Sequence, residues 1–185
     1  FERLAAAADC TILVAPEWAD ILLSRANRCL ALGGRLLGPG LELIELAADK
    51  VALADYFRQH GLPIPAGCPL DRGDSLPASF HYPAILKPRF GAGSAGLQWI
   101  DGPAGKVAWD PRFSQYRLEE YCPGMAVSVV ILMGPGDSHV LPACRQLLPE
   151  DQTFQYRGGS LPIADSLAKR AEHLAERAAD VLPDA

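Results

Sequence analysis

The stretch YPAILKPRFGAGSAGLQWI, from Tyr82 to Ile100, constrains the fold of this chain more than any other segment. Its apolar run AILK, closed by a proline, is typical of a buried strand, and the six residues from Gly91 to Gly96 include three glycines. The following AGLQWI alternates in polarity and breaks at the Gly-Pro pair 102–103, which leaves too few residues for a helix. The segment therefore predicts two antiparallel strands joined by a flexible glycine-rich loop.

Gly91, Gly93 and Gly96 spell G-x-G-x-x-G, which in a dinucleotide-binding fold lies between a strand and a helix that holds the pyrophosphate. The G-x-S-x-G turn of serine hydrolases needs the same strand and helix, and Ala92 occupies its first glycine position. Because no helix is expected after Gly96, both interpretations fail. The loop can instead close over phosphate oxygens, through its backbone N–H groups and the Ser94 hydroxyl, or be an ordinary mobile hairpin tip.

Four side chains near this loop are candidates for binding a nucleotide. Lys87 ends the first strand, where it can contact a phosphate or extend along the surface into water. Kinases place their glycine-rich loop before the phosphate-binding lysine, so the order here argues against a kinase. Lys50, in the first turn of a predicted helix, is either a second phosphate contact or a solvated lysine. In LEEYCPG, Glu119 and Glu120 end a strand and face opposite sides, so only one can point inward.

Periodicity and turn residues give the remaining elements. Residues 10–16, 17–32 and 35–38 predict a strand, a helix and a strand, and hence one βαβ unit with a domain boundary near residue 39. Asp49 and Gly61 are the expected caps of a helix that ends at His60. We further expect a helical turn over 41–47, a polar connection over 69–81, strands over 116–124, 125–134 and 139–148, and an amphipathic helix over 166–182.

Composition limits the class of protein. The net charge of −5 argues against nucleic acid as a partner, and no apolar run approaches the roughly 18 residues of a membrane span. Residues 1–30 lack the pattern of a signal peptide. The five scattered cysteines include no C-x-x-C pair, and the four histidines lack ligand spacing, so we expect no metal held by these residues. Cysteine usage of this kind favours a reducing cytoplasm.

The ordered run DK…GLPIP…YPAILKPRFGAGSAG…LEEYCPG…SVVIL resembles the ATP-grasp superfamily of carboxylate–amine ligases over residues 39 to about 148. The resemblance implies an α/β chain, α+β within the grasp, in which two subdomains sandwich ATP. Residues 39–185 would form this domain, and residues 1–38 the end of a Rossmann-like domain before it. The implied contacts to ATP are Lys50, Lys87, Gly91, Gly93, Ser94, Gly96, Glu119, Glu120, Tyr121 and Cys122.

The implied roles follow the family. The two lysines would contact phosphates, with Lys87 also catalytic, and the loop would cover them. Glu119 would accept from the adenine amino group, while the backbone of Tyr121 and Cys122 would read the adenine edge. An acidic residue that holds the ribose in related ligases is replaced by Ala126. The magnesium-binding strands of the family should follow residue 185, so the Mg ligands are expected beyond it.

ALGGRLLGPGLELIELAADK and FQYRGGSLPI look most like the tyramine–glutamate ligases of methanofuran biosynthesis. This narrower resemblance implies that Arg145, Arg157, Gly158 and Gly159 lie near the substrate, and that Arg157 is also catalytic. The alternative is that residues 157–159 form a plain turn before the last helix. The expected activity is ATP-dependent joining of a small-molecule carboxylate to an amine such as tyramine, with ADP as product. A homodimer is a candidate assembly. The alternative function is a non-catalytic ATP-binding module or an inactive part of such a ligase, which Ala126 and the absent metal strands favour.

Overall fold

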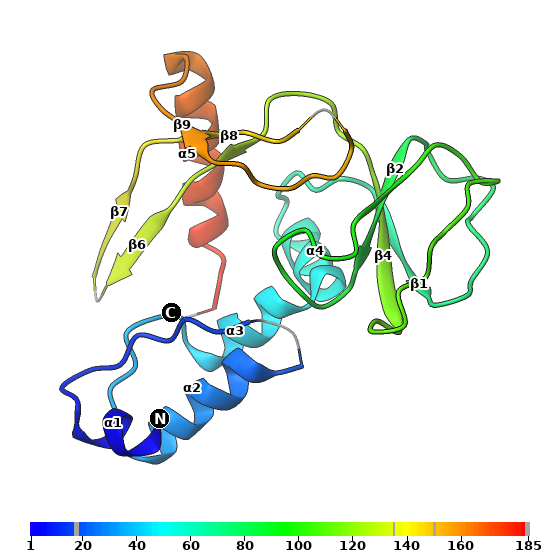
Figure 1. Cartoon of the computed structure of the whole chain (residues 1–185). Helices are drawn as coiled ribbons and strands as arrows, with labels where there is room; N and C mark the ends of the chain where they lie inside the picture. Colours follow the sequence, from blue (N-terminus) through cyan, green and yellow to red (C-terminus); the bar gives the residue numbers. More distant parts are fainter. Residues whose placement is uncertain (17–18, 135, 150, 184–185) are drawn as a thin grey trace.

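The computed structural model of the chain describes residues 1–16, 19–134, 136–149 and 151–183. Figure 1 shows a helical N-terminal part, the largest sheet at one end, and smaller sheets with the last helix at the other. Helix α4 (Lys50–Gln59) lies between the last two parts. No helix among the described residues is both long and apolar enough to cross a membrane.

The N-terminal part contains helices α1 (Glu2–Ala7) and α2 (Ile21–Ala31). Residues 17 and 18 of the predicted helix lie outside the described residues. The predicted strands over 10–16 and 35–38 meet only at a parallel bridge between Thr11 and Leu36. Ile12 and Val14 are largely exposed, so this run lacks the neighbouring strands that would bury it on both faces. The prediction of two full strands was therefore wrong in extent.

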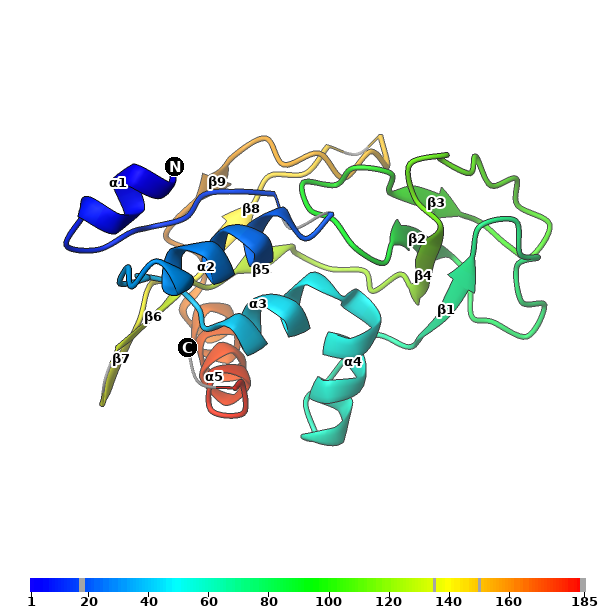
Figure 2. The same cartoon turned by 90° about the horizontal axis from the view of Figure 1, so that it is seen from below.

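Helix α3 (Leu41–Ala48) packs against both α2 and α4, as Figure 2 shows. Asp49 separates α3 from α4 and caps α4, because its carboxylate accepts from the Val51 and Ala52 N–H groups at 3.0 and 3.2 Å. The helix ends at a C-cap, His60, followed by Gly61 in the left-handed region with φ of +69°. Both predicted caps are confirmed.

The large sheet consists of β1 (Gly67–Asp71), β2 (Ala84–Pro88), β3 (Gln98–Ile100) and β4 (Gln115–Glu120), in the order β1-β4-β2-β3. All its neighbouring strands are antiparallel. The predicted pair of strands around the glycine-rich loop is thus confirmed as β2 and β3. The predicted connection over 69–81 was wrong for its first three residues, which belong to β1, because an edge strand tolerates Pro69.

The two faces of this sheet differ in chemistry because successive side chains alternate. One face carries the core, and the opposite face carries Ile85, Lys87, Arg117 and Glu119, with Lys87 paired to Arg117 and Ile85 to Glu119. We call the second one the charged face. The buried members of the core are Leu70, Ala84, Leu86, Ile100, Tyr116 and Leu118.

A three-stranded sheet of β5 (Val127–Ser128), β8 (Cys144–Gln146) and β9 (Gly159–Ser160) and a hairpin of β6 (Ile131–Gly134) and β7 (Asp137–Val140) complete the strands. Each of the predicted strands over 125–134 and 139–148 was too long, because the structure has two shorter strands in its place, β5 and β6 in the first case and β7 and β8 in the second. Pro142, which has no N–H to donate, lies between β7 and β8. Helix α5 (Asp165–Ala179) is shorter than predicted, and its Leu174 and Ala178 line an apolar cavity with Phe57 of α4.

Candidate functional site

The charged face of the sheet borders a cavity of about 280 Å³ beneath the glycine-rich loop. The loop forms its roof, β2 and β4 its floor, and the start of α4 one side. The lining residues are Lys50, Ile85, Lys87, Pro88, Gly91, Ala92, Gly93, Ser94, Ala95, Leu97, Glu119 and Phe154. A larger hollow of about 550 Å³ lies among α2, α3 and α4, but the charged side chains around it, including Asp20, Glu42 and Glu45, are carboxylates that would repel a phosphate.

Lys87 projects from β2 into this cavity and forms an ion pair with Glu119 of β4. Its Nζ donates to Glu119 Oε1 at 2.6 Å, and Arg117 Nε donates to Glu119 Oε2 at 2.9 Å. The side chains of Lys87 and Glu119 are 22% and 18% exposed, so water reaches the pair only in part. A lysine ammonium held in this way, facing a cavity, is a preorganised point charge for an anion.

Lys50 reaches the same cavity from the other side, at the first residue of α4. Its Nζ donates to Gly91 O at 2.5 Å and to Arg89 O at 3.5 Å, and its backbone N–H donates to Arg89 O at 3.1 Å. The Arg89 guanidinium in turn donates to both carboxylate oxygens of Asp49, at 2.8 and 2.6 Å. The start of α4 and the start of the glycine-rich loop are therefore tied together.

The pKa of the Asp49 carboxyl is affected by its burial and by its hydrogen bonds. Burial raises the pKa of Asp49, but hydrogen bonds from Arg89 and from the Ala52 and Val51 N–H groups outweigh burial and hold it below its usual range. A carboxyl with a lowered folded-state pKa stabilises the fold above its unfolded pKa of about 3.9, and this contribution is lost as the pH falls through the folded value.

We expect Asp49→Asn to lower the free energy of unfolding by about 1.5–3 kcal/mol at pH 7, because Arg89 loses a charged partner in a partly buried place. The difference from the wild type should shrink as the pH falls below about 4, first because Asp49 of the unfolded chain becomes protonated and then, at lower pH, because Asp49 of the folded protein is protonated as well. Urea denaturation at pH 7 and pH 3 measures both. Asp55→Asn is the control, since its ion pair with Arg58 is half exposed and should contribute less than about 1 kcal/mol. A constant difference at both pH values would contradict this account.

The glycine-rich loop adopts backbone conformations that most side chains avoid. Gly96 has φ of +74°, and a Cβ there would lie 2.9 Å from Pro88 Cγ and 3.1 Å from a Phe113 ring carbon. Ser94 also has a positive φ, of 61°, and its Oγ donates to Phe154 O at 2.7 Å. Glycine at position 96 is therefore needed both for its conformation and for the close approach of the loop to the sheet.

The segment that follows β4 was expected to read an adenine edge. The Tyr121 N–H already donates to Pro83 O at 3.0 Å, whereas no described residue accepts from the Cys122 N–H. Cys122 itself is exposed. The Glu120 side chain points to the core side of the sheet, where it lies 3.7 Å from His81, so Glu119 is the carboxylate that faces the cavity.

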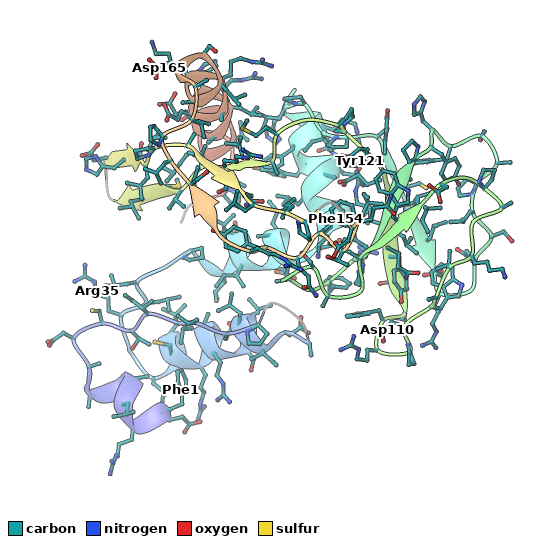
Figure 3. All side chains as sticks on the ribbon, turned by 45° about the horizontal axis from the view of Figure 1, so that its top comes forward. Phe1, Arg35, Asp110, Tyr121, Phe154 and Asp165 are labelled. Carbon is teal, nitrogen blue, oxygen red and sulfur yellow. The ribbon has the colours of Figure 1, made fainter. Side chains whose placement is uncertain are left out.

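Aromatic rings gather around Phe154, which lines the cavity; Figure 3 labels Phe154 and Tyr121. Trp99 of β3 contacts Tyr121 edge-on, with ring centroids 4.7 Å apart. It also lies nearly parallel to Phe154, at 6.4 Å. Rings of this kind offer flat apolar surfaces to a planar base.

The predicted substrate residues lie outside the cavity. Arg145 is on β8 with an exposed side chain, and the Arg157 N–H donates to Leu147 O at 2.9 Å in the extension of the same sheet. Gly158 O accepts from the Leu147 N–H, and Gly159 pairs with Gln146. The structure thus brings Lys50, Lys87, Glu119 and the glycine-rich loop together, whereas Glu120 faces away and the four predicted substrate residues lie apart from them.

Sequence reasoning missed three residues of the site. Arg117 stands two positions before Glu119, and strand alternation alone could have placed both on one face. Arg89 and Phe154 gave no comparable signal, because their partners Asp49 and Ser94 are 40 and 60 residues away. Among the described residues, no group of three or more His, Cys, Asp or Glu side chains is arranged to hold a metal ion.

Comparison with known proteins identifies the family of this site. The model of the ATP-grasp domain matches residues 47–185. The chain belongs to the ATP-grasp domain family. The fold class predicted from the sequence is therefore confirmed, while the boundary near residue 39 and the division into domains stay predictions.

Individual proteins similar to this ATP-grasp chain include a biotin carboxylase from Halalkalibacterium halodurans, 30% identical over 80 residues, which are 40% of this chain and 18% of the relative. An ATP-grasp superfamily protein from Archaeoglobus fulgidus has a TM-score of 0.75 at 20% identity, over 99% of this chain and 52% of that one. A D-Ala:D-Ser ligase from Enterococcus faecalis has a TM-score of 0.68 at 16% identity, over 86% and 52%. At these identities the two structures show the fold alone, and the chain spans about half their length.

Proposed function

We propose that the protein is an ATP-dependent carboxylate–amine ligase that forms ADP. The observation that carries the proposal is the Lys87–Glu119 pair at 2.6 Å beneath the glycine-rich loop, with Lys50 on the opposite side of the same cavity. Membership of the ATP-grasp family and similarity to a D-Ala:D-Ser ligase support this chemistry. The residues present fit ATP, because two lysines and a loop rich in glycine are suited to phosphate oxygens.

In the proposed reaction, a substrate carboxylate oxygen attacks the γ-phosphorus and the bond to the ADP oxygen breaks. The products of this step are an acyl phosphate and ADP. The amine nitrogen then attacks the acyl carbon, phosphate leaves, and the nitrogen loses a proton. The protein needs no nucleophile of its own for this sequence, so its contribution is to position the reactants and to neutralise charge through Lys87 and Lys50. Magnesium is expected to accompany ATP, where it would neutralise phosphate charge.

The proposed substrates are an amino-acid carboxylate and an amine. The narrower resemblance to tyramine–glutamate ligases makes glutamate and tyramine the first pair to examine, with Arg157 and Arg145 as candidate substrate contacts. Arg145 lies on β8, and Arg157 is three residues after Phe154 and hydrogen-bonds to Leu147 just beyond β8. Phe154 itself lines the cavity.

The test is release of phosphate and ADP from Mg-ATP with a panel of amino acids and amines, including glutamate and tyramine. Hydroxylamine added in place of the amine should trap the acyl phosphate as a hydroxamate. Formation of ADP that requires both substrates supports the ligase. Binding of ATP without turnover with any pair would instead favour a non-catalytic ATP-binding module, for which Ala126 in place of a ribose-binding acid is the specific observation. Absence of ATP binding would overturn both.

A further inference from the structure

We propose that Arg117 is a positioning residue of the phosphate site, which holds Glu119 in place and offsets its charge so that Lys87 keeps a net positive charge toward the nucleotide. This inference rests on the proposed function, since it concerns the same cavity. Arg117 does not line the cavity and acts only through Glu119.

The geometry singles out Arg117 among the charged side chains of the sheet. It is only 1% exposed, although β4 brings it to the same face as Lys87, with which it is paired across the strands. Its Nε donates to Glu119 Oε2 at 2.9 Å and its Nη2 donates to Pro65 O at 3.1 Å. A buried guanidinium with both a carboxylate and a carbonyl as acceptors is fixed in orientation, and it fixes the carboxylate in turn.

The neighbouring edge strand β1 leaves room for this guanidinium. Gly67 of β1 pairs with Glu119, and a Cβ at Gly67 would lie 2.6 Å from Arg117 Nη2 and 2.7 Å from its Cζ. Glycine weakens a strand, so it is expected inside one where another group must approach closely. The buried arginine and the glycine beside it thus form one arrangement, and Lys87, Glu119 and Arg117 form what we call the charge triad.

The charges of the triad explain what the arginine adds. A lysine paired to one glutamate has a net charge of zero and loses much of its attraction for an anion. With Arg117 on the second carboxylate oxygen, the triad has two positive charges and one negative charge, and its net charge is +1. The Lys87 ammonium remains oriented by Glu119, but the carboxylate is shared between two cations. Such a triad should act on the phosphates through its net charge, so its effect should also appear with a phosphate ligand that has no base or ribose.

The experiment compares ADP with tripolyphosphate, which lacks base and ribose, as ligands of the protein. Arg117→Met removes the charge and keeps much of the volume, and we expect it to weaken the binding of ADP and of tripolyphosphate at least tenfold each. Arg117→Met/Glu119→Gln removes one charge of each sign, restores the net charge of +1 on Lys87, and should bind ADP more tightly than Arg117→Met. In a Lys87→Met background, Arg117→Met should weaken ADP binding further, because it leaves the Glu119 carboxylate without a cation and changes the net charge of the group from 0 to −1. Isothermal titration and circular dichroism measure affinity and folding.

Two outcomes would overturn the inference: an Arg117→Met protein with wild-type affinity for ADP and tripolyphosphate, or a double variant that binds both no more tightly than Arg117→Met does, which a merely structural role predicts. If Arg117→Met does not fold, the double variant decides, because it has no uncompensated carboxylate. It must then bind ADP more tightly than Lys87→Met does, and a weaker affinity refutes the triad. A wild-type protein that binds neither ADP nor ATP refutes the proposed function itself, and so the two failures are distinguishable.

Discussion

Replacing Lys87 with alanine is expected to weaken ATP binding about a hundredfold or more. The change removes a charge-assisted contact to phosphate, worth about 1.5–3 kcal/mol, and it also leaves the Glu119 carboxylate facing the phosphate with only Arg117 as partner. Repulsion between the carboxylate and the phosphate adds to the loss, and each 1.4 kcal/mol corresponds to a tenfold change in affinity. Isothermal titration with Mg-ATP measures the effect.

Lys106→Ala is the control for the Lys87 prediction, because Lys106 is exposed in the connection between β3 and β4 and its loss changes the net charge equally. Its affinity for ATP should equal that of the wild type. Circular dichroism should show that both variants are folded. Wild-type affinity in Lys87→Ala would remove the basis for placing the phosphates in this cavity.

Replacing the neighbouring Leu86 with alanine is expected to lower the free energy of unfolding by about 3 kcal/mol, within the range of 2–5 kcal/mol for such changes in a core. Leu86 is fully buried on the core face of β2, where it pairs with Leu118 of β4, and its removal leaves a cavity in the middle of the sheet. Urea denaturation followed by circular dichroism measures the loss.

Leu132→Ala is the matched control for the Leu86 prediction, since Leu132 lies on strand β6 but is 55% exposed and should contribute less than about 1 kcal/mol. Below the denaturation transition, Leu86→Ala should still bind ATP, because its side chain faces away from Lys87. Leu86 would then affect the stability of the fold, and the adjacent Lys87 the binding of ATP. Equal losses of stability in Leu86→Ala and Leu132→Ala would contradict the assignment of the two faces.

Local patterns in the sequence were enough to predict the glycine-rich hairpin and the caps of α4. The strand before the loop, the missing helix after it, and the Asp49 and Gly61 signals all depend on neighbouring residues. The family likeness depended on the order of such segments, and the family match confirmed it.

The parts that were not predicted depend on contacts between distant residues. The place of Arg117 beside Lys87 required the register of β2 against β4, and the place of Phe154 required the path of a segment 60 residues beyond Ser94. The lengths of the strands near residues 10–16 and 139–148 depended on which neighbours they pair with, and apolar composition does not contain that information.

The glycine-rich loop is attached both at its base and at its tip, and the difference between these attachments determines how a ligand could enter. At its base, Lys50 holds the carbonyls of Arg89 and Gly91, and the Asp49–Arg89 ion pair strengthens the same junction. At its tip, the contact with the Phe154 segment is the hydrogen bond from Ser94. Opening should therefore be a rotation of the tip about a fixed base near Gly91, on the nanosecond-to-microsecond timescale of loop motion, without displacement of α4. The lysines would stay in place during this motion, so a nucleotide would meet its phosphate contacts already assembled.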